Sequence, residues 1–396
     1  KIQPEPQHMV VSPNGHYLVT SQSTENLQLK MWNLQWRLPK PVLAWSAGGI
    51  VDQIALLNDE RLLCGTRSGA DVEISIWQVP WNASASDLDV TMWQYGKLAV
   101  SLRAVMEVSY PLPGCKQLTA LTATRDGNWL LCGCNNSEVQ ILKMSSAALT
   151  RMSAKSSITG IAAFGPSSFA IADASGSVCL YSISSRQQSS MAMPPCFFPG
   201  GTVNAISVSH DQQYVFSGSS NGRVCRWDLS MNRVSEFCYN QPGFEPRRVT
   251  NVWPSQSGTL VSSSVNGVIA VWDLRLAPEV QASPSVTYTA VDFGIILTLS
   301  PDGTIMYTSG NGGALCGWFA ESVPSYVRRF QNSDLCYHQT CSTSSIKASG
   351  KTPIRMPLWL DAVPLRALEL QDAVIEYFAP TPPRSMQYVN LSGSST

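Results

Sequence analysis

The chain has 396 residues, and its 27 Lys and Arg residues balance 27 Asp and Glu residues, which gives a formal net charge of zero. A chain without excess positive charge has no overall attraction for phosphate backbones or anionic lipid, which argues against a histone-like or generally nucleic-acid-coating protein. Hydrophobic residues make up 44% of the chain and charged residues 14%, a composition that can bury large cores. The apolar stretches are shorter than the ~18 residues that a membrane-spanning helix needs.

The first residues and the cysteines indicate where the protein is found. The start, KIQPEPQH, is polar and interrupted by proline, so it predicts no secretory signal. Because the sequence starts at Lys1 and not at Met, we expect a piece of a longer protein. The 11 cysteines are odd in number and lie mostly in apparent strands, where a thiol behaves as a small hydrophobic group. They predict no disulfide framework, and we expect a reducing compartment, the cytoplasm or the nucleus.

A strand that ends in an aromatic residue recurs along the chain, mostly at intervals of 45 or 46 residues. The aromatic residues are Trp32, Trp77, Tyr181, Trp227, Trp272 and Trp318. The long interval between Trp77 and Tyr181 holds one further repeat, which ends at Leu142, and an insertion over about residues 80–114. The pattern therefore predicts seven repeat units over residues 1–320.

Each repeat has the same order of elements. An apolar first strand, as at Val203–Val208, Ile158–Phe164 and Leu118–Thr122, leads into a tight polar turn, as at Ser12–Gly15, Arg125–Gly127 and Ser300–Gly303. Asn-Gly and Asp-Gly tolerate positive φ and suit hairpin turns. A second strand rich in small residues follows, and a third strand ends on the aromatic residue. Small side chains on one strand and bulky ones on the next predict sheets that pack face to face.

The period, the Ser-Pro-Asp-Gly turns and the Trp-Asp pairs at Trp227-Asp228 and Trp272-Asp273 resemble the WD40-repeat β-propeller. The resemblance implies an all-β fold, a seven-bladed WD40-type β-propeller over residues 1–320. Most strand ends lack the Asp after Trp, and Gly-His is missing before the first strands. We therefore expect the His–Ser–Asp–Trp hydrogen-bond network of the family to be mostly absent.

Residues 321–396 differ from the repeats. The stretch 322–350 is polar and rich in Ser and Thr, which predicts a loop. Pro364 suits a helix start, and Leu370, Val374 and Phe378 would share one helical face, so we predict a short helix over about residues 364–378. A linker-like tail follows. The expected C-terminal extension thus consists of a loop, a short helix and a tail.

The sequence does not predict an enzyme, and it predicts no catalytic, cofactor-binding or metal site. The match of Gly218–Gly222 to G-x-S-x-G lies in a hairpin turn between strands, whereas a nucleophile elbow needs a following helix. The four histidines lack metal-ligand spacing, and no phosphate-binding loop occurs. Cys132 and Cys134 alternate with Gly along a strand, so we interpret both thiols as packing groups.

Binding to other proteins or peptides, as subunits of a larger assembly, is the leading hypothesis. In a propeller the loops before the first strands share a rim with those between the second and third strands. There the sequence places Asp52, Arg67, Asp173, Asn221, Phe244, Arg247, Arg248, Asn266 and Asn311. Arg and aromatic residues on a rim are typical interface anchors, so the partner-binding candidates are Asp52, Arg67, Phe244, Arg247 and Arg248.

Two alternative functions remain open. The stretch that ends at Trp272, Asp273 and Arg275 is similar to the WDxR box of WD40 proteins that serve as substrate receptors of cullin-4 ubiquitin ligases, although Asn266 replaces the usual Asp. The second alternative is an RNA-associated propeller subunit, which would depend on a basic rim patch such as Arg247 with Arg248.

The insertion over residues 80–114 is longer than a simple connection between strands. Its alternating Leu98, Val100 and Leu102 are expected to extend the outer strand of the unit that ends at Trp77. Met92 and Trp93 either fold back onto this unit or form an exposed apolar partner site.

Overall fold

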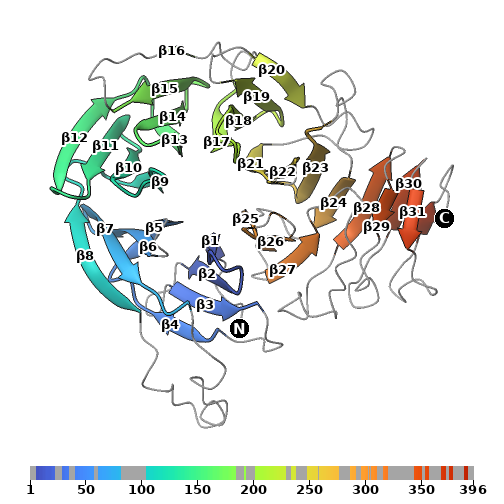
Figure 1. The fold of residues 1–396 in the computed structure, drawn as a ribbon, viewed down its shortest axis with the longest axis horizontal. Helices are drawn as coiled ribbons and strands as arrows, with labels where there is room; N and C mark the ends of the chain where they lie inside the picture. Colours follow the sequence, from blue (N-terminus) through green and yellow to red (C-terminus); the bar gives the residue numbers. More distant parts are fainter. Residues whose placement is uncertain are drawn as a thin grey trace, which may run out of the picture. The chain divides into compact units, whose positions relative to one another are not determined.

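The computed structural model describes the strands and most of the turns between them. The described residues are 6–22, 29–34, 41–57, 61–81, 104–183, 191–192, 201–228, 233–237, 248–256, 258–275, 286–290, 296–301, 303, 305–309, 315–319, 343–349, 353–355, 367–371, 374–377 and 388–390. Every regular element among them is a β-strand (Figure 1). These residues include no helix that could span a membrane.

The chain forms two compact units. The first, here called the N-terminal unit, comprises Pro6–Phe169 and Ser182–Gln188. The second, the C-terminal unit, comprises Lys1–Glu5, Ala170–Tyr181 and Ser189–Thr396.

The N-terminal unit is built from four-stranded antiparallel sheets whose strands follow one another in chain order. The first sheet has β1 (Pro6–Val11), β2 (Tyr17–Gln22), β3 (Leu29–Asn33) and β4 (Leu43–Trp45). The second has β5 (Ile50–Leu56), β6 (Leu62–Ser68), β7 (Asp71–Gln78) and β8 (Val105–Pro111). The third has β9 (Leu118–Ala123), β10 (Trp129–Cys134), β11 (Glu138–Lys143) and β12 (Ala148–Ser153). The unit also contains β13 (Ile158–Phe164), the first strand of the next sheet.

The C-terminal unit continues the same plan. The unit boundary falls in β14 (Ser168–Asp173), which is followed by β15 (Val178–Ser182) and β16 (Met191–Ala192). The next sheet has β17 (Val203–Val208), β18 (Tyr214–Ser219), β19 (Val224–Asp228) and β20 (Arg233–Phe237). Then come β21 (Val249–Pro254), β22 (Thr259–Ser264), β23 (Val268–Asp273) and β24 (Val286–Ala290). The sheet of β25 (Ile296–Leu299), β26 (Ile305–Ser309) and β27 (Leu315–Phe319) has three strands. The count of seven blades stays a prediction.

The C-terminal extension corrects one prediction. Its strands are β28 (Thr343–Ser349), β29 (Pro353–Arg355), β30 (Ala367–Gln371), β31 (Val374–Tyr377) and β32 (Tyr388–Asn390). β28 pairs antiparallel with β24, and β30 and β32 add to it in parallel. The helix predicted over residues 364–378 is therefore wrong, since two strands occupy most of that segment. Ala-Leu-Glu-Leu-Gln alternates apolar and polar residues, and Val-Ile-Glu-Tyr is rich in residues that favour strands, which explains the difference.

The polar turns between first and second strands are confirmed, and they share one hydrogen-bond pattern. The hydroxyl of Ser12 accepts a hydrogen bond from the backbone N–H of Tyr17 at 2.9 Å and donates to Asn14 Oδ1 at 2.6 Å. Ser209 repeats both bonds, to Tyr214 at 2.9 Å and Asp211 at 2.5 Å. The φ of Gly15 is 72°, which glycine adopts without strain. In these two turns, a serine two residues before Asn or Asp therefore satisfies the turn backbone, and Thr124 with Asp126 does the same in the turn at Arg125–Gly127.

The small residues of the second strands let adjacent sheets approach closely. A Cβ atom on Gly65 would lie 2.2 Å from Leu118 Cδ2, and one on Gly133 would lie 2.5 Å from Ile158 Cγ2, both within the N-terminal unit. In the C-terminal unit a Cβ on Gly218 would lie 2.4 Å from Val249 Cγ1. In each case the neighbouring residue begins the first strand of another sheet. The absence of a side chain on glycine therefore leaves the space that this residue occupies. Gly218 also lies in β18, which confirms that the G-x-S-x-G match belongs to a hairpin.

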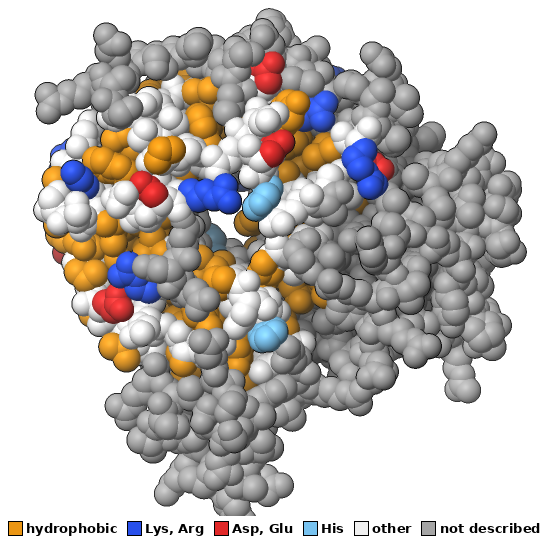
Figure 2. All heavy atoms as spheres, in the orientation of Figure 1, with side chains coloured by type: hydrophobic (Ala, Val, Ile, Leu, Met, Phe, Trp, Pro, Cys, Tyr) orange, Lys and Arg blue, Asp and Glu red, His pale blue; other side chains and the backbone are white. Residues whose placement is uncertain are grey.

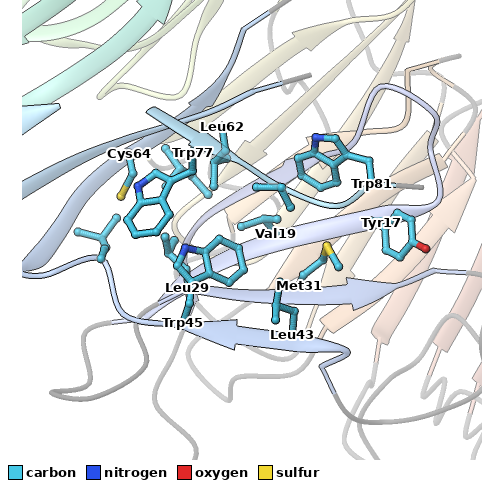
Figure 3. Close-up of a cluster of buried hydrophobic side chains, with 14 of the residues drawn as sticks. Tyr17, Val19, Leu29, Met31, Leu43, Trp45, Leu62, Cys64, Trp77 and Trp81 are labelled. Carbon is cyan, nitrogen blue, oxygen red and sulfur yellow. The ribbon is translucent and has the colours of Figure 1, made fainter. Parts of the chain in front are cut away.

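Aromatic side chains fill the core between the first two sheets of the N-terminal unit (Figure 3). Trp45 and Trp77 meet at a ring-centroid distance of 6.3 Å, and Tyr17 packs on Trp81 at 6.5 Å. Tyr17 and Trp81 each retain 3% exposure. Trp81 lies beyond the end of β7, so the chain after this strand first folds back onto the core.

The family's hydrogen-bond network was expected to be mostly absent, but its bonds from tryptophan to a hydroxyl group are present in this chain. The indole Nε1 groups of Trp32, Trp227 and Trp272 donate to hydroxyls of the adjacent second strands. The acceptors are Thr20 at 3.0 Å, Ser217 at 3.1 Å and Ser262 at 3.0 Å. These bonds occur even at Trp32, which has no Asp after it, because they need only a hydroxyl opposite the indole.

One disulfide corrects the interpretation of the cysteines. Cys134 at the end of β10 is bonded to Cys115, and their Cα atoms are 5.6 Å apart. Cys134 is therefore not a packing thiol, although Cys132 is a buried free thiol, as expected. Sequence spacing missed the pair because Cys115 lies in a loop that only the fold brings to β10.

The insertion contains the outer strand of the second sheet. β8 at Val105–Pro111 pairs with β7, whereas Leu98–Leu102, predicted to extend this strand, lies outside the described residues. Met92 and Trp93 also lie outside them.

Candidate partner-binding rim

Three first strands of the N-terminal unit, β1, β5 and β9, each carry a β-bulge near their start. The strand register skips Gln7 in β1, Asp52 in β5 and Thr119 in β9. A bulge adds one residue to a strand and redirects its side chain. We name the bulge residues, together with their neighbours His8, Ile50 and Arg67, the first-strand rim.

Asp52 and Arg67, both predicted for this rim, form an ion pair. The Nε atom of Arg67 lies 3.3 Å from Asp52 Oδ2, and its Nη2 lies 3.4 Å from Oδ1. Asp52 Oδ2 also accepts a hydrogen bond from the backbone N–H of Leu118 at 3.2 Å. The Asp52 side chain is 4% exposed and that of Arg67 is 31% exposed. The buried Asp52 therefore orients the guanidinium, and Arg67 is the member of the pair that is exposed to solvent.

An exposed apolar side chain lies beside this pair. Ile50 is the register partner of Arg67 across β5 and β6, and it is 51% exposed. Gly49 precedes it, and a Cβ atom there would lie 2.7 Å from the carbonyl oxygen of Arg67. Close approach of the two backbones thus places Ile50 against Arg67. Sequence reasoning missed Ile50, because alternation alone assigns the first residue of an apolar strand to the core.

His8 connects β1 to this rim. Its imidazole donates a hydrogen bond to the backbone carbonyl of Asp52. Burial lowers the pKa of His8 to about 4, although this hydrogen bond acts in the opposite direction. Between β5 and β9, Gln53 Nε2 donates to the carbonyl of Thr119 at 3.0 Å. These bonds fix the rim backbone across three sheets.

The rim candidates of the C-terminal unit are only partly described. Arg248 is exposed just before β21, and its carbonyl accepts a hydrogen bond from Val265 N at 3.0 Å. Phe244 and Arg247 lie outside the described residues, so their predicted roles remain proposals. The first strands β17 and β21 carry bulges at Asn204 and Thr250, which the sequence did not reveal.

Three other predicted rim residues take part in their own turns. Asp173 Oδ1 accepts hydrogen bonds from the backbone of Ser175 at 3.0 Å and Ser177 at 3.2 Å. Asn221 and Asn266 accept from Ser219 and Ser264. Asn311 lies outside the described residues. These side chains serve local structure first.

The WDxR-like box forms a rigid arrangement at the end of β23. Trp272 and Asp273 are buried, and Arg275 pairs with Asp273 through Nε–Oδ1 and Nη2–Oδ2 contacts of 2.8 Å each. Burial alone would raise the pKa of Asp273, but the hydrogen bonds and charge of Arg275 outweigh it, so the pKa lies below its ordinary value. The Arg275 side chain remains 49% exposed, so it is the member of the box that faces solvent.

Charged side chains are scattered over the face that Figure 2 shows. In Figure 2 the basic and acidic groups lie singly or in small groups among hydrophobic and uncharged atoms. The described residues bring no three His, Cys, Asp or Glu side chains together as a metal site.

Comparison with known proteins identifies the repeat. The model of the WD domain, G-beta repeat family matches residues 195–228, the segment that contains the Ser209 turn and the Trp227–Ser217 bond. No curated protein sequence matches the chain.

Two solved structures are similar to this one. The structure of U3-55K is 17% identical, with a TM-score of 0.56 over 77% of this chain and 88% of its own. The crystal structure of RRP9 WD40 repeats is 16% identical, with a TM-score of 0.58 over 77% of this chain and 87% of its own. These identities establish similarity of fold alone. Together with the repeat match and the Trp–Ser bonds, they show a WD40 repeat at residues 195–228 and an all-β fold similar to that of WD40-repeat propellers.

Proposed function

We propose that this chain is a non-enzymatic interaction scaffold that docks partner proteins or peptides through the first-strand rim of its N-terminal unit. The observation that supports this proposal is the pairing of Arg67 with Asp52 beside the exposed Ile50. An apolar side chain and a fixed guanidinium on neighbouring strands offer a partner both desolvation and directed hydrogen bonds.

The energetics of binding favour such an arrangement. Arginine is enriched among the residues that dominate interface affinity. Ordering a free side chain on binding costs about 0.5–1.5 kcal/mol. Because Asp52 already orients Arg67, much of this cost is met by folding. The bulges and interstrand bonds likewise fix the surrounding backbone before a partner arrives.

Affinity purification with quantitative mass spectrometry tests the proposal. Arg67→Ala and Ile50→Ser should each lower recovery of the main partner about tenfold, the effect of losing about 1.4 kcal/mol. Arg151→Ala is the matched control, because Arg151 is also an exposed arginine in an ion pair, 3.4 Å from Glu138. Equal recovery with Arg67→Ala and Arg151→Ala would refute the assignment of the rim.

A second candidate function is that of a substrate receptor of a cullin-4 type ubiquitin ligase. The observation that favours it is the half-exposed Arg275, held by the buried Asp273. Arg275→Ala should abolish co-purification of a cullin-4 adaptor and leave rim-dependent partners unchanged. Absence of the adaptor from wild-type purifications would remove this candidate.

A further inference from the structure

The outer strand β8 exposes an apolar sheet edge. β8 is the last strand of its sheet, and β7 is its only partner among the described strands (Figure 1). Val105 is 55% exposed and the adjacent Met106 is 51% exposed. A strand edge presents unpaired backbone N–H and C=O groups, and exposed apolar side chains on it favour pairing with another chain.

The other outer strands of the N-terminal unit are protected. β12 exposes Ala148, Thr150 and Arg151, and the charge of an arginine discourages strand pairing. β4 has only three residues, of which two are buried. β8 is longer, with seven residues, and its own charged residue, Glu107, lies at a bulge and is paired with Arg61, which leaves Val105 and Met106 exposed beside it. Folding of the sheet does not require an exposed Val-Met pair, so a binding role accounts for it better.

This chain already shows how such an edge is covered. β24 holds the same fourth position in its repeat as β8, and β28 pairs antiparallel with it from Val286–Ala348 to Ala290–Thr343. The outer edge of a blade of this type can therefore accept a further strand.

The sequence argues against β8 pairing with the segment directly before it. No Gly, Pro, Asn or Asp occurs between Lys97 and Tyr110, and tight hairpins depend on these residues. Apolar residues instead alternate without a break from Leu98 to Tyr110, the pattern of one continuous strand. The sequence therefore does not favour a tight hairpin as the source of a strand on this edge.

We propose that β8 binds an extended segment of a partner protein as a fifth, antiparallel strand. Val105 and Met106 point to opposite faces of the sheet, so apolar side chains at alternate positions of such a segment would cover one of the two. Basic or hydroxyl side chains in between suit the exposed carboxylates of Glu73 and Glu107, of which Glu107 is paired with Arg61 at 3.0 Å. This surface is separate from the first-strand rim and deepens the proposed scaffold function by naming a second kind of contact.

The hydrogen-bond pattern between β7 and β8 identifies a substitution that blocks only the open edge of β8. Leu112 N donates to Val72 O at 2.8 Å, so Leu112 faces β7. N–H directions alternate along an antiparallel strand, which places the N–H of Tyr110 toward β7 and that of Ser109 on the open side. Ser109→Pro therefore removes an outward donor and spares the pairing with β7. Ser109→Ala is the matched control, since it removes only the hydroxyl bond to Glu73.

The experiment measures binding of a blocked synthetic heptapeptide in which Val and Ile alternate with Thr and Lys, with an N-methylated version as the negative probe. Wild type and Ser109→Ala should bind the peptide within twofold of each other, and Ser109→Pro about tenfold more weakly, because a hydrogen bond is lost and the ring obstructs pairing. If Ser109→Pro does not fold, Val105→Lys with Met106→Lys replaces it, and Thr150→Lys on β12 is its control.

Four results would overturn the proposal. The first is that wild type does not bind the peptide, and the second is that Ser109→Pro binds it as well as wild type does. Deletion of residues 84–94 strengthens binding about tenfold, which would make the insertion the natural occupant. The last is that wild type forms a dimer that Ser109→Pro abolishes, which would make a second copy of this chain the occupant. Arg67→Ala should leave peptide binding unchanged, so failure at β8 and failure at the first-strand rim are separable.

Discussion

Gly133 in β10 lies where β13, the first strand of another sheet, approaches most closely. A Cβ atom at this position would lie 2.5 Å from Ile158 Cγ2, 3.1 Å from Ile158 Cβ and 3.2 Å from Ala120 Cβ. Favourable carbon contacts are about 3.5–4.0 Å, so the nearest one is about 1 Å too short. Ile158 is 1% exposed, and its β-branched side chain cannot rotate to remove Cγ2 from the contact. Gly133→Ala must therefore push two strands apart.

The expected cost of Gly133→Ala follows from this geometry. Overpacking of a core costs about 1–3 kcal/mol, and this contact falls in the upper half of that range. Alanine recovers about 0.5–1 kcal/mol of strand preference relative to glycine. The net loss in the free energy of unfolding is thus about 1–2.5 kcal/mol. At about 2–4 °C per kcal/mol, the melting temperature should fall by roughly 2–10 °C.

Thermal and urea unfolding, followed by tryptophan fluorescence, measure this loss, and a double-mutant cycle assigns its cause. Ile158→Ala alone should cost about 2–5 kcal/mol. In the double variant the new methyl group occupies space vacated by Cγ2, so the combined cost should be about 2 kcal/mol less than the sum. Gly127→Ala is the contrasting control, because Gly127 has a φ of 70° and no neighbour within 4 Å. Costs of Gly133→Ala and Ile158→Ala that add within about 0.5 kcal/mol would refute the packing argument.

Three further predictions concern hydrogen bonding, the disulfide and pH. Ser262→Ala removes an acceptor of the buried Trp272 indole and should cost about 1–3 kcal/mol in urea unfolding; a similar cost in a Trp272→Phe background would contradict it. Cys115→Ser, or reduction of the bond to Cys134 across 19 residues of sequence, should lower stability by about 3 kcal/mol, and peptide mapping by mass spectrometry checks the bond itself. Because the folded pKa of His8 is about 4, below its ordinary 6.5, unfolding takes up a proton there. Its stabilising contribution is thus complete above pH 6.5 and decreases as pH falls toward 4. The loss should be about 1–3 kcal/mol and smaller in His8→Gln, and identical pH profiles would contradict the assignment.

The sequence predicted the repeating part of the fold because each repeat carries local signals. Val203–Val208 and Ile158–Phe164 are first strands with the predicted bounds, since apolar runs bounded by a Ser-x-Asp or Gly-Pro turn leave few alternatives. The helix over residues 364–378 was predicted from one apolar face, yet Leu368 and Leu370 also alternate as in a strand. Periodicity over so few residues does not separate the two structures.

The site was less predictable because it depends on contacts between repeats. Asp52 and Arg67 were both placed on one rim, but their ion pair and the burial of Asp52 follow from the bulge in β5. A bulge shifts the register by one residue without a characteristic residue type here, so the sequence did not indicate that Ile50 is exposed beside Arg67. The Cys115–Cys134 bond was missed for the same reason, since it joins a loop to a strand through tertiary structure.

The bulges also explain how a generic repeat can carry specific recognition. In the N-terminal unit the same backbone irregularity presents Gln7, Asp52 and Thr119 in three successive sheets. The strand ladder fixes the backbone on both sides of each bulge. Asp52 is buried and accepts a hydrogen bond from Leu118 N, so this bulge side chain also contributes to stability. The same carboxylate orients Arg67, whose side chain is 31% exposed. If the rim binds partners as proposed, its specificity depends on which side chains occupy these constant backbone positions.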